Sequence, residues 1–139
     1  MYCLEIRDHI MIAHSFKGAF FGPAQNMHGA TFIVDVAFFR AQLSQENVVV
    51  DIGRALDALK AVLKPLNYQN LDAIPEFEGI QTTTEFLARH IFDKMAQAAH
   101  AGELGPGGEG IGRMRVTLHE SHVAKGGYEA DMPIQKAQA

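Results

Sequence analysis

The sequence predicts an α+β domain in which two helices cover one face of a four-stranded antiparallel sheet, in the order ββααββ. Apolar side chains alternate with polar ones near the N-terminus, recur at helical spacing in the middle of the chain, and alternate again near the C-terminus. Each alternating strand has one apolar face, and both helices are needed to cover it. A length of 139 residues, 47% of them hydrophobic, fits one domain over residues 1–139.

Two N-terminal strands are predicted from alternation with a period of two residues. The apolar positions of the first strand share one parity, and they are Leu4, Ile6, Ile10 and Ile12. The apolar positions of the second strand also share one parity, and they are Phe32, Val34, Val36 and Phe38. A loop rich in Gly, Pro and Asn, from Lys17 to Met27, joins the two strands.

Two helices follow. Asp51 is expected to cap the first, which ends before Pro65 and has its apolar stripe at Ile52, Leu56, Leu59 and Leu63. The second begins at a predicted capping box, with Glu85 three residues after Thr82. Its apolar stripe consists of Leu87, Ile91, Met95 and Ala98. A glycine-rich segment from Gly102 to Gly112 ends it, and because this segment joins a helix to a strand, we expect a connection rather than a phosphate-binding loop.

The last two strands are shorter. The third has Met114, Val116 and Leu118 on one face. The fourth is expected around Tyr128 to Met132, after a turn at Lys125-Gly126-Gly127, and residues 134–139 are expected to fray.

Composition and charge narrow the classes of function. Twelve Lys and Arg against sixteen Asp and Glu give a net charge of −4 with no basic stripe, which argues against nucleic acid as a partner. The one cysteine, Cys3, excludes an intramolecular disulfide and zinc sites built on several cysteines. No apolar run is long enough to cross a membrane, and the N-terminus lacks a basic segment followed by an apolar one, so we expect a cytoplasmic protein.

Three titratable residues extend the apolar faces of the predicted strands. His14 continues the first strand, His28 has the parity of the second, and Glu120 continues the third. Two neutral imidazoles that face one space suit a zinc ion, and a carboxylate on an apolar face needs a hydrogen-bond donor. In the alternative interpretation, each histidine bonds to backbone or lies near solvent, and Glu120 is an exposed strand-end acid.

Several segments occur together in an order that resembles the 6-pyruvoyltetrahydropterin synthase / 6-carboxytetrahydropterin synthase family. They are His14, His28-Gly29, Val50-Asp51-Ile52-Gly53, Leu71-Asp72-Ala73-Ile74-Pro75-Glu76, Thr83-Thr84-Glu85 and His119-Glu120-Ser121. The resemblance extends from about Leu4 to Tyr128. It implies the ββααββ tunnelling fold, whose sheets join into a barrel in trimers or hexamers, and a role in queuosine or biopterin biosynthesis.

The resemblance also implies a reaction. Members of this family eliminate triphosphate from 7,8-dihydroneopterin triphosphate, with a zinc ion held by three histidines and a cysteine base that works with an Asp–His pair. By this resemblance, His14 and His28 match the first two zinc ligands. Glu120 matches the glutamate that anchors the pterin ring, and Thr83 matches the threonine near the ring.

The sequence departs from the family pattern at the other catalytic positions. The third zinc histidine is replaced in His28-Gly29-Ala30, and Ala24 stands at the place of the cysteine. The Asp–His pair becomes Asn67-Tyr68, and asparagine is no base near neutral pH, while a tyrosine hydroxyl titrates about three units higher. The remaining histidines are expected at the surface, and they are His9, His90, His100, His119 and His122.

Three functions are therefore open at the level of sequence. The first is a zinc-dependent lyase of the family type. The second is a catalytically altered member that binds a pterin or purine-like ring without the family reaction. The third is an oligomeric structural or interaction protein with an empty pocket.

Overall fold

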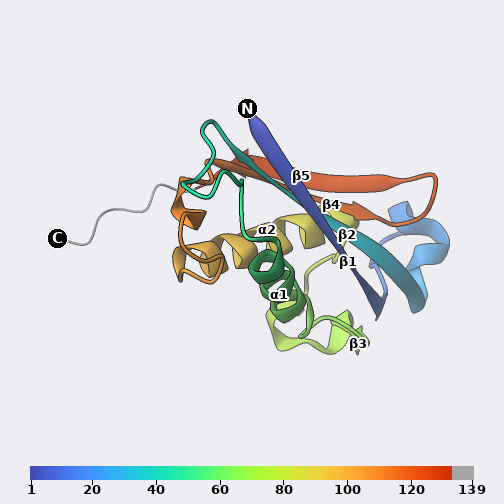
Figure 1. The fold of residues 1–139 in the computed structure, drawn as a ribbon. Helices are drawn as coiled ribbons and strands as arrows, with labels where there is room; N and C mark the ends of the chain where they lie inside the picture. The colour runs from blue at the N-terminus through green and yellow to red at the C-terminus, as the bar shows by residue number, and fades with distance from the viewer. Residues whose placement is uncertain (133–139) are drawn as a thin grey trace.

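The computed structural model describes residues 1–132 and has two layers, a twisted sheet and two α-helices on one of its faces (Figure 1). The helices are α1 (Ile52–Leu63) and α2 (Thr84–His100). The strands are β1 (Tyr2–His14), β2 (His28–Arg40), β3 (Gln69–Asn70), β4 (Arg113–His119) and β5 (Lys125–Asp131). Their order in the sheet is β3-β1-β2-β4-β5. The predicted tail, residues 134–139, lies outside the described residues.

The prediction of a four-stranded antiparallel sheet needs one correction. The four long strands pair antiparallel as expected, but β3 pairs parallel with β1 at Ile12 and Ala13, so the sheet has five strands and is mixed. A strand of two residues shows no alternation that a sequence pattern could reveal. It forms because the preceding backbone is fixed to β1, where the Tyr68 N–H donates to the carbonyl of Met11.

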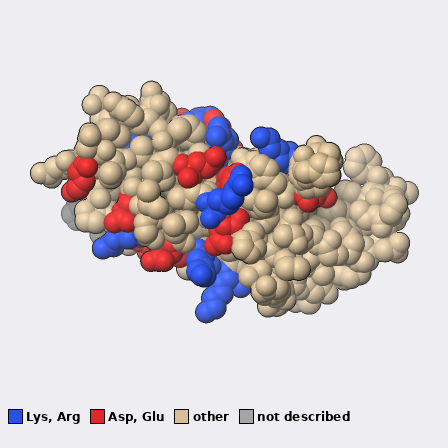
Figure 2. Space-filling model, turned by 45° about the vertical axis from the view of Figure 1, so that its right-hand side comes forward, with Lys and Arg blue, Asp and Glu red and all other residues tan. Residues whose placement is uncertain are grey.

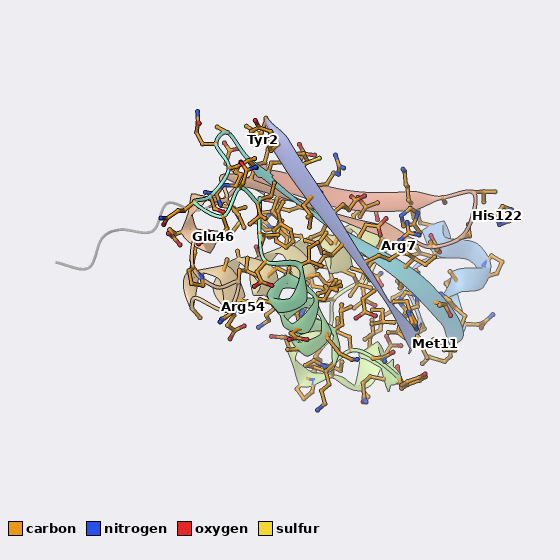
Figure 3. All side chains as sticks on the ribbon, in the orientation of Figure 1. Tyr2, Arg7, Met11, Glu46, Arg54 and His122 are labelled. Carbon is orange, nitrogen blue, oxygen red and sulfur yellow. The ribbon has the colours of Figure 1, made fainter. Side chains whose placement is uncertain are left out.

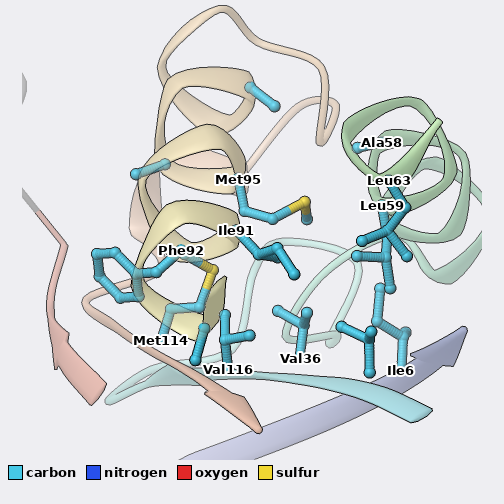
Figure 4. Close-up of a cluster of buried hydrophobic side chains, with 14 of the residues drawn as sticks. Ile6, Val36, Ala58, Leu59, Leu63, Ile91, Phe92, Met95, Met114 and Val116 are labelled. Atoms are coloured by element: carbon cyan, nitrogen blue, oxygen red, sulfur yellow. The ribbon is translucent and has the colours of Figure 1, made fainter. Parts of the chain in front are cut away.

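The side chains on the inner face of the sheet are the ones predicted from the alternation of each strand. β1 and β2 pair along their whole length, from Tyr2 with Arg40 to His14 with His28. The buried side chains of these strands that face the helices include Ile6, Ile10, Ile12, Phe32, Val34, Val36 and Phe38. α1 lies against β1, and α2 lies against β4 and β5. Figure 4 shows Ile91 and Met95 of α2 above Val36 and Met114.

The two helix starts differ from each other in how well they follow the prediction. The Asp51 carboxylate caps α1 as expected, accepting from the Arg54 N–H at 3.1 Å. The cap of α2 is Thr83, whose hydroxyl oxygen accepts from the Phe86 N–H at 3.2 Å. The predicted capping box that begins at Thr82 is therefore wrong by one position, because the Thr82 side chain is buried elsewhere.

The apolar stripe of α1 is shifted from its predicted face. Leu59 and Leu63 are buried as expected, but Ile52 and Leu56 are exposed, and Ala55 and Ala58 take their places against the core. Alanine has too little surface to dominate a hydrophobicity pattern, yet its small size allows the helix close to the sheet.

The glycine-rich segment before β4 is a connection, as predicted. It wraps around the buried guanidinium of Arg40, whose Nη1 donates to the carbonyls of Gly107 and Val49 at 2.9 and 3.1 Å. A side chain at Gly110 would collide with this guanidinium, and one at Gly105 would collide with Arg54. These glycines make room for two arginines.

The β4–β5 hairpin turns earlier than predicted. Its loop covers residues 120–124, where the Glu120 N–H donates to the Ala124 carbonyl at 3.0 Å, and Lys125-Gly126-Gly127 already belongs to β5. Figure 3 shows His122 at this loop, beyond Arg7 of β1. Gly127 serves close packing, since a Cβ there would lie 2.6 Å from the carbonyl oxygen of Val116.

Within residues 1–132, no helix combines the length and apolarity needed to cross a membrane. Acidic and basic side chains are intermixed over the face drawn in Figure 2, and that face has no extended patch of one charge.

Candidate functional site

Two histidine side chains meet at the ends of β1 and β2. His14 and His28 are directly paired in the sheet, and their ring centroids lie 4.6 Å apart. His14 is 3% exposed, whereas His28 is half-buried. The antiparallel register therefore brings together two residues that the parity of each strand had placed on the same face.

Each imidazole is oriented through its Nδ1 atom. His28 Nδ1 lies 2.8 Å from the carbonyl oxygen of Asn26, and because a carbonyl only accepts, this nitrogen carries the proton. His14 Nδ1 lies 3.1 Å from the hydroxyl oxygen of the buried Thr82. When the His28 ring is neutral, its Nε2 therefore has the lone pair, which is the arrangement that lets a histidine act as a ligand or a base.

Burial lowers the pKa of His14, and the charge of the adjacent His28 lowers it further. A hydrogen bond to the backbone of Thr82 and the charges of Asp72 and Glu120 oppose this shift and do not overcome it. The ordinary pKa is 6.5, so the His14 imidazole is mainly neutral at pH 7.

Aromatic rings form one wall beside the histidine pair. The Phe16 ring lies 4.6 Å from the His14 ring and 5.7 Å from the His28 ring, and it packs on Phe21 at 4.8 Å. Phe16 has the same parity as His14, two residues further along, so extending the apolar face past the histidine could have found it. Thr82 carried no comparable signal, because three threonines stand in a row there.

Glu120 lies just beyond the end of β4 and is exposed. The Thr84 hydroxyl, in the first residue of α2, lies 3.5 Å from its Oε2 atom. This contact joins Glu120 to the start of α2, and the negative charge of Glu120 raises the pKa of His14. Thr83, the other residue assigned to the ring by resemblance, uses its hydroxyl oxygen to cap α2.

The positions that depart from the family pattern have roles in the backbone. The carbonyl of Ala24 accepts from the Phe16 N–H at 3.1 Å. Asn67 Oδ1 accepts from the Met11 N–H at 3.0 Å, and Tyr68 is 77% exposed and has a positive φ of 59°. Asn67 and Tyr68 therefore hold the end of β1 and offer no base to the site.

The donors at this site are too few for a catalytic zinc ion. Such an ion takes three protein ligands, and Ala30 stands where the third is expected. Nowhere in residues 1–132 do three His, Cys, Asp or Glu side chains form a group that could hold a metal. His119 is already bound to Asp35 at 2.8 Å. His90, expected at the surface, has a side chain that is only 14% exposed because it packs against Phe77.

Comparison with known proteins gives one family. Residues 3–131 match the family model described as 6-pyruvoyl tetrahydropterin synthase. A 6-pyruvoyl tetrahydrobiopterin synthase of Dictyostelium discoideum is 31% identical over 77 residues, which cover 54% of this chain and 57% of that protein. This alignment thus spans little more than half the length of the curated relative.

The fold is shared with solved structures at lower identity. The 6-pyruvoyl tetrahydropterin synthase of Caenorhabditis elegans superposes with a TM-score of 0.76 at 20% identity, covering 93% of this chain and 95% of that one. The protein of the same name from Plasmodium vivax gives a TM-score of 0.72 at 14% identity, covering 94% and 99%.

Proposed function

The chain belongs to the 6-pyruvoyl tetrahydropterin synthase family, and from this premise we propose that it has a pterin synthase-like function and acts on a reduced pterin triphosphate. The substrate implied by the family is 7,8-dihydroneopterin triphosphate, and the reaction is elimination of triphosphate. The observation that carries the proposal is the convergence of His14 and His28 beside Thr82, with Glu120 at the neighbouring start of α2.

Glu120 is the proposed anchor of the pterin ring. Its carboxylate is exposed, and its one described hydrogen bond, to Thr84, is long at 3.5 Å. Its oxygens are therefore free to accept from the amino group and the ring N–H of a pterin, which form a pair of adjacent donors. The wall of Phe16 and Phe21 offers an apolar surface near the same end of the sheet.

The proton that elimination removes needs a base, and we assign this role to His14. Its imidazole is mainly neutral at pH 7 because burial lowers its pKa. In the proposed reaction His14 accepts a proton from a side-chain carbon of the substrate, the electron pair of that C–H bond forms a carbon–carbon double bond, and triphosphate leaves with the electron pair of its C–O bond. The alternatives at the family positions are absent, since Ala24 and Asn67 cannot accept a proton.

Zinc held by His14 and His28 is proposed as an alternative to the His14 base, because a zinc ion would take the imidazole lone pair that accepts the proton. Zinc bound there would supply Lewis-acid polarisation of the substrate hydroxyls. His14 and His28 offer two imidazole donors, one fewer than a catalytic zinc ion requires. Zinc bound here would need a further donor that residues 1–132 do not place beside the pair, so no step of the proposed reaction depends on it.

We also propose that the chain forms a closed homo-oligomer, a trimer or a hexamer with joined sheets. β5 is an edge strand of the sheet, and exposed edges favour pairing with another chain. Light scattering coupled to gel filtration tests this, and a monomer at micromolar concentration would contradict it. The cytoplasmic location stays a prediction from the sequence.

One experiment separates these possibilities. Freshly purified protein and the variants His14→Ala and Glu120→Gln are assayed for zinc content, pterin binding and triphosphate release. The proposal expects triphosphate release by the wild type, loss of turnover in His14→Ala, and loss of pterin binding in Glu120→Gln. His9→Ala and Glu109→Gln, at exposed positions, are the matched controls. Pterin binding without triphosphate release would indicate the altered ring-binding member, and no pterin binding would overturn the proposal.

A further inference from the structure

A cavity of about 510 Å³ lies between the C-terminal part of α1, the loop before α2, and α2 itself. None of its lining residues belongs to the histidine-pair site. Its volume is in the range of cavities that bind small molecules. Part of the lining is apolar, with Val62 and Leu66 on one side and Ile74 and Ala98 on the others.

A half-buried histidine forms part of the wall of this cavity. The side chain of His90 is 14% exposed and is held by the rings of Phe77 and Phe86, at 5.0 and 6.4 Å. Its Nε2 atom lies 4.0 Å from Oε1 of Glu76, too far for a hydrogen bond. His90 is one of the residues that line this cavity, so a molecule bound in it meets the imidazole.

Opposite charges flank this imidazole. Burial lowers the pKa of His90, so the ring is neutral near pH 7 and offers a lone pair. Glu76 has its Oε1 atom 4.0 Å from His90 Nε2, and the charges of Glu76 and Asp93 raise this pKa while the charge of Lys94 lowers it. Lys94 follows His90 by four residues on α2, which places the two side chains on one helix face about 5–6 Å apart.

These groups match the two charges of an amino acid. An ammonium placed in the gap between Glu76 and His90 can donate one N–H to the carboxylate and another to the neutral imidazole. The carboxylate group of the same amino acid would then lie beside Lys94, which is one helical turn beyond His90 on α2. A ligand with only a negative charge would be repelled by Glu76 and Glu103, and a ligand with only an ammonium group would leave Lys94 without a partner.

We propose that this cavity binds a zwitterionic α-amino acid with an apolar side chain. Glu76 and His90 hold the ammonium group, Lys94 holds the carboxylate, and Val62, Leu66 and Ile74 contact the side chain. The site is distinct from the proposed pterin site and does not depend on it.

The test is calorimetric titration of the full-length protein with L-leucine, 3-methylbutylamine, 4-methylpentanoate and glycine. L-leucine carries both charges and an apolar chain. The amine and 4-methylpentanoate keep the apolar chain but have only the positive or only the negative charge, and glycine has both charges without the chain. L-leucine is expected to bind at least about tenfold more tightly than any of the other three, because each lacks one of the three recognised groups. Equal binding of the amine, or no binding of L-leucine at millimolar concentration, overturns the proposal.

Variants then assign the contacts. Lys94→Gln is expected to weaken L-leucine about tenfold and leave the amine unchanged, and Glu76→Gln to weaken both. Lys60→Gln and Glu46→Gln, at exposed positions outside the cavity lining, are the matched controls and should bind as the wild type does. Unchanged L-leucine affinity in both cavity variants would refute the assignment. Glu120→Gln should leave L-leucine binding unchanged, which separates this site from the pterin site.

Discussion

Two buried titratable groups lie on opposite faces of the β1–β2 pair, and they are held in different ways. Asp35 lies on the face without helices, where its side chain is 7% exposed and Arg7 donates to both its oxygens, at 2.7 and 2.9 Å. His119 contacts the same carboxylate at 2.8 Å. His14 lies on the helix side, and the side-chain group that contacts its ring nitrogen is the Thr82 hydroxyl.

The pKa is lowered in both groups, with opposite consequences. Hydrogen bonds from Arg7 are the largest cause of the lowered pKa of Asp35, so that carboxylate stays ionised with its oxygens engaged. Burial is the largest cause for His14, so that imidazole loses its charge and keeps a lone pair. Burial beside a charged partner therefore keeps Asp35 ionised and its oxygens bonded, whereas burial without such a partner leaves the His14 imidazole neutral.

The largest effect is expected from removing the partnered carboxylate. Asp35→Ala leaves Arg7 and His119 without their shared acceptor and should lower the free energy of unfolding by about 1–3 kcal/mol. Urea denaturation measures this difference. Glu109→Ala, at an exposed position, should change stability by less than about 0.5 kcal/mol. Equal effects in the two variants would show that the Asp35 cluster is not structural.

The Asp35 cluster should also make the folding stability depend on pH in the acid range. The folded pKa of Asp35 lies below its ordinary value of 3.8, so its contribution is fully present above pH 3.8 and is lost as the pH falls through the folded pKa. The stability difference between the wild type and Asp35→Asn should therefore shrink at low pH. A difference that stays constant to the lowest pH at which both proteins fold would contradict this.

A smaller effect is expected on the inner face. Thr82→Val removes the hydroxyl that contacts His14 Nδ1 and should cost about 1 kcal/mol of folding stability. It should also reduce turnover in the proposed reaction, because it frees the His14 ring to rotate. Thr31→Val, on an exposed position of β2, is the control. An unchanged stability would mean that the Thr82 contact does not orient the ring.

The smallest expected effect is the change in folding stability when His14 takes up a proton. Its folded pKa lies below the ordinary 6.5, so the unfolded chain binds the proton more readily, and stability falls as the pH drops below 6.5. His14→Asn should lessen this slope without removing it, because the pKa of His90 is lowered too. His9→Asn, at an exposed position of β1, should retain the full slope. An unaltered slope in His14→Asn would contradict the neutral imidazole.

The candidate site could be predicted only in part. Parity placed His14 and His28 on one face, and antiparallel pairing made them neighbours. Phe16 follows from the same parity, two residues after His14. Thr82 could not be predicted, because it lies 68 residues from His14 and its position depends on how α2 begins.

The sequence alone determined the properties that depend on neighbouring residues. The inner face of each long strand follows from a period of two, and the cap at Asp51 follows from the side chain and the helix that comes after it. Tertiary structure decided which buried polar groups have partners. Asp35 meets Arg7 and His119 across 28 and 84 residues. A local pattern carries no information over such separations, because the contacts form only when the sheet and helices are assembled.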